Sequence, residues 1–209
     1  MEDTSSSPLS YALFETEIGL CAIIWGRIGV RGVQLPEANA VAAQARINRR
    51  FPGAQKSDPS PDITKAIDAM CALLRGEAID VEHIALDMTA ISPFNARVFA
   101  LARQIPPGQT KTYGEIAKAL GLAEAARAVG QAMSENPFPI IVPCHRVLAA
   151  GGKTGGFSAP GGVNTKLRML TIERARTAVN AVEPELFAYL PLAAKPRTPF
   201  SVKAGNRRP

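Results

Sequence analysis

The residues of this chain best suited to covalent chemistry are a cysteine and a histidine that follow one another, Cys144 and His145. A cysteine thiolate is strongly nucleophilic, and histidine exchanges a proton near neutral pH, so the pair could form a covalent bond to a substrate. A Cys-His dipeptide alone also has a plainer interpretation, a small buried hydrophobic residue beside a polar neighbour. The surrounding residues must decide between the two.

The pair lies near the end of a proline-rich segment, Asn136 to Val147, which we call the active-site arm. Its prolines are Pro137, Pro139 and Pro143. Proline lacks an N–H donor and restricts φ, so we expect neither helix nor central strand but a stiff, extended arm. Neighbouring side chains on an extended segment point to opposite sides, so we expect His145 to reach Cys144 through a water molecule. Thiol hydrolases bring the two residues together from distant positions, so their adjacency suits activation of a thiolate better than repeated acyl transfer.

Composition places the chain among globular proteins. It has 209 residues, of which 46% are hydrophobic, enough for one large or two small domains. No apolar run reaches the ~18 residues of a membrane span, and the N-terminus is acidic and polar, so we expect a cytoplasmic protein. Three widely spaced cysteines predict no disulfide framework. A net charge of +6 favours nucleic acid or other acidic partners without choosing between them.

We predict an α+β protein. After a disordered stretch over 1–8, strands near 11–16, 20–25 and 30–35 predict an antiparallel meander, and Gln55 to Ser60 reads as a polar loop. Helices are expected over 40–50 and from Pro61 to Leu74, and a returning strand over 79–86. These elements form an N-terminal domain over 9–88. Its only candidate zinc ligands, Cys21 and His83, are too few for a structural site, so no metal is expected.

The second domain, 89–178, is predicted to be mainly helical with a helix-turn-helix. A helix begins at Pro93, a Thr112-x-x-Glu115 capping box begins a second, and the Gly121 turn leads to a third over 123–134. Small residues dominate this third helix and Arg127 is its only cation, which favours sequence-tolerant contact with a DNA groove. The alternative is a packing helix with one solvated arginine. A closing helix runs from 163 to about 175 and places Lys166 and Glu173 near one face.

Several ordered motifs together resemble the O(6)-alkylguanine-DNA alkyltransferase family. The matching segments are Thr112–Ala117, Ala125–Gly130, Asn136–Val147 and Gly155–Ser158, followed by Lys166 and Glu173. The resemblance covers residues 93 to 173 strongly and the N-terminal part only in general shape. It implies a repair reaction in double-stranded DNA, in which the alkyl group of O(6)-alkylguanine, and of O(4)-alkylthymine, moves irreversibly to the protein's own cysteine. It also implies a monomer without a cofactor that acts once.

The resemblance further implies a role for each matching residue. Cys144 is the acceptor, His145 takes its proton through water, and Glu173 holds the other imidazole nitrogen. Asn136 ties the recognition helix to the arm, and Tyr113 donates a hydrogen bond to the leaving guanine and helps turn the phosphate. Further substrate contacts come from Val147, through its carbonyl, and from Phe157 and Ser158. DNA contacts come from Arg127, which fills the gap left by a flipped base, and from Ala126, Gln131 and Thr112.

Two departures from the family pattern and two rival functions accompany this prediction. Phe157 stands where many relatives have tyrosine, and Ala159-Pro160 is an apparent insertion in the pocket loop, which leaves the alkyl size open. The rivals are a helix-turn-helix lesion sensor with an inert cysteine and a thiol hydrolase. Residues 179–209 form a C-terminal extension, and from Lys195 onward they carry cations and no acids, as in a disordered basic tail that touches phosphates.

Overall fold

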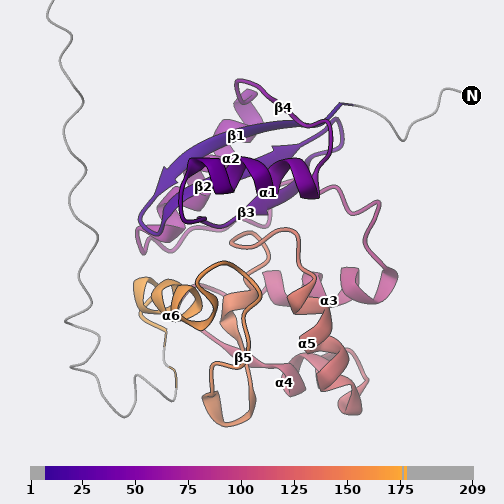
Figure 1. Ribbon diagram of the computed structural model, residues 1–209. Helices are drawn as coiled ribbons and strands as arrows, with labels where there is room; N and C mark the ends of the chain where they lie inside the picture. Colours follow the sequence, from indigo (N-terminus) through magenta and orange to yellow (C-terminus); the bar gives the residue numbers. More distant parts are fainter. Residues whose placement is uncertain (1–7, 176, 178–209) are drawn as a thin grey trace, which may run out of the picture.

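The computed structural model describes residues 8–175 and 177. The predicted disorder over 1–7 and the C-terminal extension over 179–209, with its basic tail, lie outside these residues. Figure 1 shows a sheet flanked by two helices, α1 in front and α2 behind, above a group of helices that includes α3, α4, α5 and α6. This arrangement is the predicted α+β fold.

The sheet has four strands in the order β3-β2-β1-β4. They are β1 (Ser10–Thr16), β2 (Gly19–Trp25), β3 (Val30–Gln34) and β4 (Gln55–Lys56). The predicted antiparallel meander is confirmed for the first three. The predicted loop over 55–60 is partly wrong, because β4 pairs with β1 in parallel and makes the sheet mixed. A two-residue strand without an apolar pattern leaves no period-2 signal in the sequence.

Each face of the sheet is covered by one helix. Alternate residues of a strand point to opposite faces, and in β2 Ile24 packs with Ile47 of α1 (Ala40–Arg50) while Ile23 belongs to the core that includes α2 (Pro61–Leu74). The side chains of Asn39 and Ser60 cap the two helices at their N-termini. Both predicted helices are confirmed.

The predicted strand over 79–86 is wrong. A single bridge joins Leu86 to Val30, and the rest of the segment forms turns. The carbonyls of this segment bond a side chain instead of a neighbouring strand. Nη2 of Arg103 donates to the carbonyls of Val81, Glu82 and Ile84 at 2.9, 2.6 and 3.1 Å. Carbonyls that converge on one side chain cannot alternate as a strand requires.

The second unit contains the predicted helix-turn-helix. Its α-helices are α3 (Pro93–Arg103), α4 (Tyr113–Ala119), α5 (Ala126–Ser134) and α6 (Gly162–Ile172), and the 3-10 helix η1 (Ala123–Ala125) directly precedes α5. Short pieces are β5 (Lys111–Thr112), paired in parallel with β6 (Val147–Leu148), and the 3-10 helices η2 (Cys144–Arg146) and η3 (Ala150–Gly152). The Thr112–Glu115 capping box is present, and Gly121 makes the turn with φ +76°.

The active-site arm is compact rather than extended, so that prediction is wrong. The amide of Val142 donates to the carbonyl of Phe138 at 2.8 Å, and Ile140 between them has φ +76°, which is strained for a β-branched residue. Cys144 begins the 3-10 turn η2. The prolines exclude long helix and strand, but they permit tight turns, and long-range packing decides in favour of turns. His145 therefore follows Cys144 on a turn rather than on the opposite side of an extended segment.

The sheet and the helical unit are joined at the active-site arm and at α6. The amide of Val33 in the edge strand β3 donates to the carbonyl of Pro137 at 2.8 Å. The Arg168 guanidinium donates to the carbonyls of Glu17 and Ile18 in the β1–β2 turn. The N-terminal unit thus contacts the segment that carries Cys144 directly. No described helix is long and apolar enough to cross a membrane.

Candidate active site

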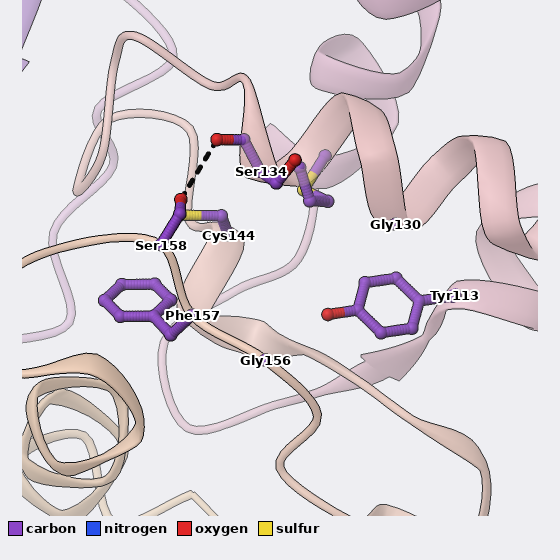
Figure 2. Close-up of a pocket in the computed structure, with 8 residues that line it drawn as sticks. Tyr113, Gly130, Ser134, Cys144, Gly156, Phe157 and Ser158 are labelled. Atoms are coloured by element: carbon purple, nitrogen blue, oxygen red, sulfur yellow. Dashed lines mark hydrogen bonds between the residues drawn. The ribbon is translucent and has the colours of Figure 1, made fainter.

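Cys144 opens into a pocket between α4, α5 and the loop after η3. The pocket has a volume of about 470 Å³, within the usual range for a small-molecule site. Its lining residues are Tyr113, Gly130, Met133, Ser134, Cys144, Gly156, Phe157 and Ser158. Figure 2 shows the hydroxyl of Tyr113 pointing across the pocket toward Phe157, and the hydroxyl of Ser158 donating to the Ser134 carbonyl at 3.0 Å. Four residues predicted from the sequence therefore meet at one cavity.

The Cys144 thiol is nearly buried, with 8% of the residue exposed. Burial raises the pKa of this thiol, although a hydrogen bond from Asn136 and the positive charge of Lys166 oppose the rise. A thiol with a raised pKa carries very little thiolate at neutral pH, so reaction requires a base that takes the proton.

His145 and Glu173 supply a base and its partner. Imidazole Nε2 lies 2.9 Å from Glu173 Oε1, and both side chains are almost fully buried. Burial raises the pKa of the Glu173 carboxyl, but hydrogen bonds and charges from His145 and Arg146 outweigh it and lower the pKa to about 2. Because Glu173 is a carboxylate, Nε2 donates to it. Nδ1 is buried and has no hydrogen-bond partner among the described residues, so it is the nitrogen left to accept a proton.

Burial also lowers the pKa of His145 from its ordinary value. Glu173 opposes this effect, whereas the positive charges of Arg146 and Lys166 reinforce it. The imidazole is consequently neutral near pH 7, which is the state a general base needs.

Arg146 is the first functional residue for which the sequence analysis gave no role. Its guanidinium donates to both Glu173 oxygens and, through Nη1, to the carbonyl of Ile105 at 2.6 Å. The partners are 27 and 41 positions distant in the sequence, so spacing could not reveal them. One signal in the sequence could have indicated a role. Arg146 stands in a strongly apolar segment that is expected to be buried, and a buried charge requires a partner.

Lys166 is the second such residue, although it was one of the family landmarks. It is fully buried on α6, and Nζ donates to the Val147 carbonyl at 2.6 Å and lies 6.0 Å from the ring centroid of Tyr113. Burial lowers the pKa of Lys166 to about 8, and the charge of a Cys144 thiolate opposes the shift. Its ammonium group therefore lies in the electrostatic environment of the cysteine.

Asn136 holds the active-site arm in shape. Its Nδ2 donates to the Val142 carbonyl at 2.8 Å, and its Oδ1 accepts from the Phe138 amide at 2.9 Å. These bonds span the strained residue Ile140 within the arm, and the Asn136 amide donates to the carbonyl of Met133 in α5 at 3.4 Å. The role of Asn136 in tying a recognition helix to the arm stays a prediction.

The remaining predicted residues lie elsewhere. Arg127 is exposed on α5, near the half-buried Ala126, and Gln131 bonds Glu135 of the same helical region at 2.7 Å. Thr112 caps α4 rather than facing the cysteine. Val147 is buried outside the pocket lining, and its carbonyl already accepts from Lys166. The structure separates a buried chemical centre from an exposed helical surface.

Comparison with known proteins agrees with this arrangement. Residues 93–175 match the family model described as the DNA-binding domain of 6-O-methylguanine DNA methyltransferase. The methylated-DNA–protein-cysteine methyltransferase of Mycobacterium tuberculosis (strain ATCC 25618 / H37Rv) is 43% identical over 111 residues, which is 53% of this chain and 65% of the relative. The protein of the same name from Methanothermobacter thermautotrophicus is 33% identical over 151 residues, 72% of this chain and 77% of the relative.

A solved structure extends the similarity to the N-terminal unit. The crystal structure of Mycobacterium tuberculosis OGT in complex with DNA has a TM-score of 0.64 and 31% identity, and the match covers 79% of this chain and 92% of that chain. The alignment with the mycobacterial sequence spans just under two thirds of that relative, whereas those with the archaeal sequence and with the solved structure span well over two thirds. Sequence and fold together show that the chain belongs to the methylated-DNA–protein-cysteine methyltransferase family.

Proposed function

We propose that this protein repairs double-stranded DNA by moving the alkyl group of O(6)-alkylguanine to Cys144, once per chain. The observation that carries the proposal is the combination of a pocket lined by Cys144 with a buried His145–Glu173 pair whose histidine is the next residue of the chain. A pocket of about 470 Å³ has room for one base but not for a base pair in a duplex. The lesion must therefore leave the helix, at a cost of a few kcal/mol.

The chemical step is a displacement at carbon. The thiol proton passes to His145 Nδ1, directly or through water, and the thiolate sulfur attacks the alkyl carbon. The carbon–oxygen bond breaks as the carbon–sulfur bond forms, and the electron pair remains on guanine. Tyr113, whose hydroxyl points into the pocket, donates a hydrogen bond to the guanine as this charge develops. The guanine anion then takes up one proton and His145 releases the one it accepted, so the net products are guanine in DNA and a thioether on Cys144.

The pocket walls suit a flat, flipped base. Phe157 and Met133 provide apolar surface, and Gly130 and Gly156 leave space that a side chain would occupy. The insertion residues Ala159 and Pro160 accept hydrogen bonds from Gly162 and Thr165 of α6, so they hold the pocket loop against that helix. Phe157 retains the ring of the family tyrosine without its hydroxyl. The same pocket would accept O(4)-alkylthymine, which is smaller.

Exposed groups on α5 and its surroundings would contact the duplex. Arg127, an exposed cation on α5, would fill the gap left by the flipped base, and the small side chain of Ala126 would allow the helix to approach closely. All the groups of the chemical step belong to one chain, so a monomer suffices.

Intact-mass analysis after incubation with an O(6)-methylguanine duplex tests the proposal. We expect the protein to gain one methylene mass and the Cys144→Ser variant to gain none. Binding of the duplex with unchanged mass would instead identify a lesion sensor. Turnover of a thioester without DNA would identify a thiol hydrolase.

A further inference from the structure

Arg146 makes more contacts to the proposed machinery than a structural salt bridge requires. Its Nε lies 3.2 and 3.0 Å from Glu173 Oε1 and Oε2, its Nη2 lies 2.7 Å from Oε1, and its Nη1 lies 2.6 Å from the Ile105 carbonyl. Only 3% of its side chain is exposed. The guanidinium is planar and its donors are fixed, so these bonds fix the plane of the Glu173 carboxylate relative to the end of α3.

The same carboxylate oxygen serves His145. Glu173 Oε1 lies 2.9 Å from imidazole Nε2, so the orientation set by Arg146 passes to the imidazole ring. The carboxylate can only accept from Nε2, which places the ring proton there and leaves Nδ1 with its lone pair. Arg146 therefore acts on the base through Glu173 without touching the pocket.

Charge gives Arg146 a second effect. The charged or titratable groups that face His145 are Glu173 and Lys166 from α6 and its C-terminal end, with Cys144 and Arg146 from its own turn. A lone Glu173 carboxylate would favour a protonated imidazole, which cannot accept the thiol proton. The positive charge of Arg146 cancels that field.

We propose that Arg146 is a positioning residue that keeps His145 neutral, with its proton on Nε2, so that Nδ1 stays available as the proton acceptor. This inference rests on the proposed function for its purpose. It concerns the protonation state of one side chain, however, and that state can be measured without DNA.

The sequence makes the measurement direct, because it contains only two histidines, His83 and His145. Carbon and nitrogen NMR of the labelled full-length protein reports the tautomer and the titration midpoint of each imidazole. His83 is exposed and serves as an internal reference. In the wild type we expect His145 to carry its proton on Nε2 and to titrate below the ordinary range of a histidine.

The variant Arg146→Met removes the charge and the fork, and we expect it to raise the His145 titration midpoint by about 1 pH unit or more. Arg146→Lys keeps the charge and should restore much of the wild-type midpoint. The matched control is Arg103→Met, because Arg103 also binds three backbone carbonyls but lies outside this network. Arg103→Met should lower stability and leave the His145 midpoint unchanged.

The alkyl-transfer rate provides the functional readout. Below its titration midpoint, the neutral fraction of an imidazole falls about tenfold for each pH unit. A midpoint raised by about 1 pH unit in Arg146→Met should therefore slow transfer about tenfold at the acidic end of the pH profile and less at alkaline pH. A loss equal at every pH would indicate a structural role and would overturn the proposal.

Two further outcomes would also overturn it. One is an unchanged midpoint and tautomer of His145 in Arg146→Met. The other, which needs no variant and applies if Arg146→Met fails to fold, is a wild-type His145 that carries its proton on Nδ1 or is protonated at pH 7. The two proposals can fail separately. If His145 behaves as expected by NMR but the protein transfers no alkyl group, the proposed function is rejected and the role of Arg146 is retained.

Discussion

The active-site arm and helix α5 are neighbours in the chain but opposite in character. In the arm, every residue from Phe138 to Val147 is buried, including the polar His145 and Arg146, and one backbone position is strained. Along α5, by contrast, Arg127, Ala128 and Gln131 are exposed, and the side-chain hydrogen bonds of Gln131 and Ser134 are local to the helix. Asn136 contacts both regions, through its side chain in the arm and through its amide to Met133 of α5.

This difference indicates a division of labour. Chemistry on a thiol requires a fixed geometry and controlled protonation, which burial provides. Under the proposed function, contact with DNA of any sequence requires an accessible surface with few base-reading groups, and the exposed side of α5 would serve as that surface. Substitutions in the arm should therefore affect the chemical step, whereas those on α5 should affect the DNA substrate alone.

The largest effect is expected for the base. His145→Ala and Glu173→Gln should slow alkyl transfer by roughly 10²–10⁴-fold, because the Cys144 thiol then loses its proton acceptor or the group that orients it. Rates measured with both the methylated duplex and free O(6)-benzylguanine should fall alike, since the defect lies in chemistry. His83→Ala is the control. Wild-type rates in either His145→Ala or Glu173→Gln would contradict the assignment.

A pH effect on stability should be next in size. The pKa of Glu173 is about 2 in the folded protein and near 4.3 in an unfolded chain, so the carboxylate contributes stability above the unfolded value. That contribution, on the order of 3 kcal/mol, should disappear as pH falls from about 5 to about 2. Urea unfolding across this range should show it.

Glu173→Gln is the control for that measurement, because its side chain does not titrate. We expect the variant to be less stable at pH 7 and to lose less stability on acidification. Parallel pH curves for wild type and variant would show that the carboxylate is not held by the His145–Arg146 network.

A smaller and more selective effect is expected on α5. Arg127→Ala should slow repair of the duplex lesion roughly tenfold, because the gap left by the flipped base is no longer filled. Reaction with free O(6)-benzylguanine should be unchanged, since no base is flipped. Lys118→Ala, an exposed cation on α4, is the matched control. Equal loss on both substrates would place Arg127 in folding and break the comparison between the two regions.

The smallest effect is expected for Gln131→Ala. Gln131 bonds Glu135 one turn further along, a contact worth about 0.2–0.5 kcal/mol in a helix. Thermal unfolding and duplex repair should both stay close to wild type. A loss of tenfold or more in duplex repair would show that Gln131 reads the DNA and that α5 is more than a plain surface.

Much of the fold could be predicted because its signals are local. The capping box at Thr112 and Glu115 and the glycine turn at Gly121 both depend on residues within one turn of each other. The three antiparallel strands likewise follow from neighbouring segments. The wrong predictions, a strand over 79–86 and a loop at β4, depend on partners far away in the sequence.

The site divides in the same manner. Cys144, His145 and Glu173 could be named from motifs, and the structure brings the latter two to 2.9 Å. The positive φ of Ile140, the fork of Arg146 on Glu173 and the burial of Lys166 could not, because they result from packing of α3, α6 and the arm around one another. Residue types show which chemistry is possible, whereas protonation states depend on the folded surroundings.

The most direct test of the central claim, a single transfer to Cys144, counts transferred groups. A known amount of protein is mixed with excess duplex that carries labelled O(6)-methylguanine, and the methylated protein is then digested and mapped. We predict a burst that stops at one methyl group per chain, located on the peptide that contains Cys144 and absent in Cys144→Ser. Continued turnover, or label on Cys21 or Cys71, would contradict the account.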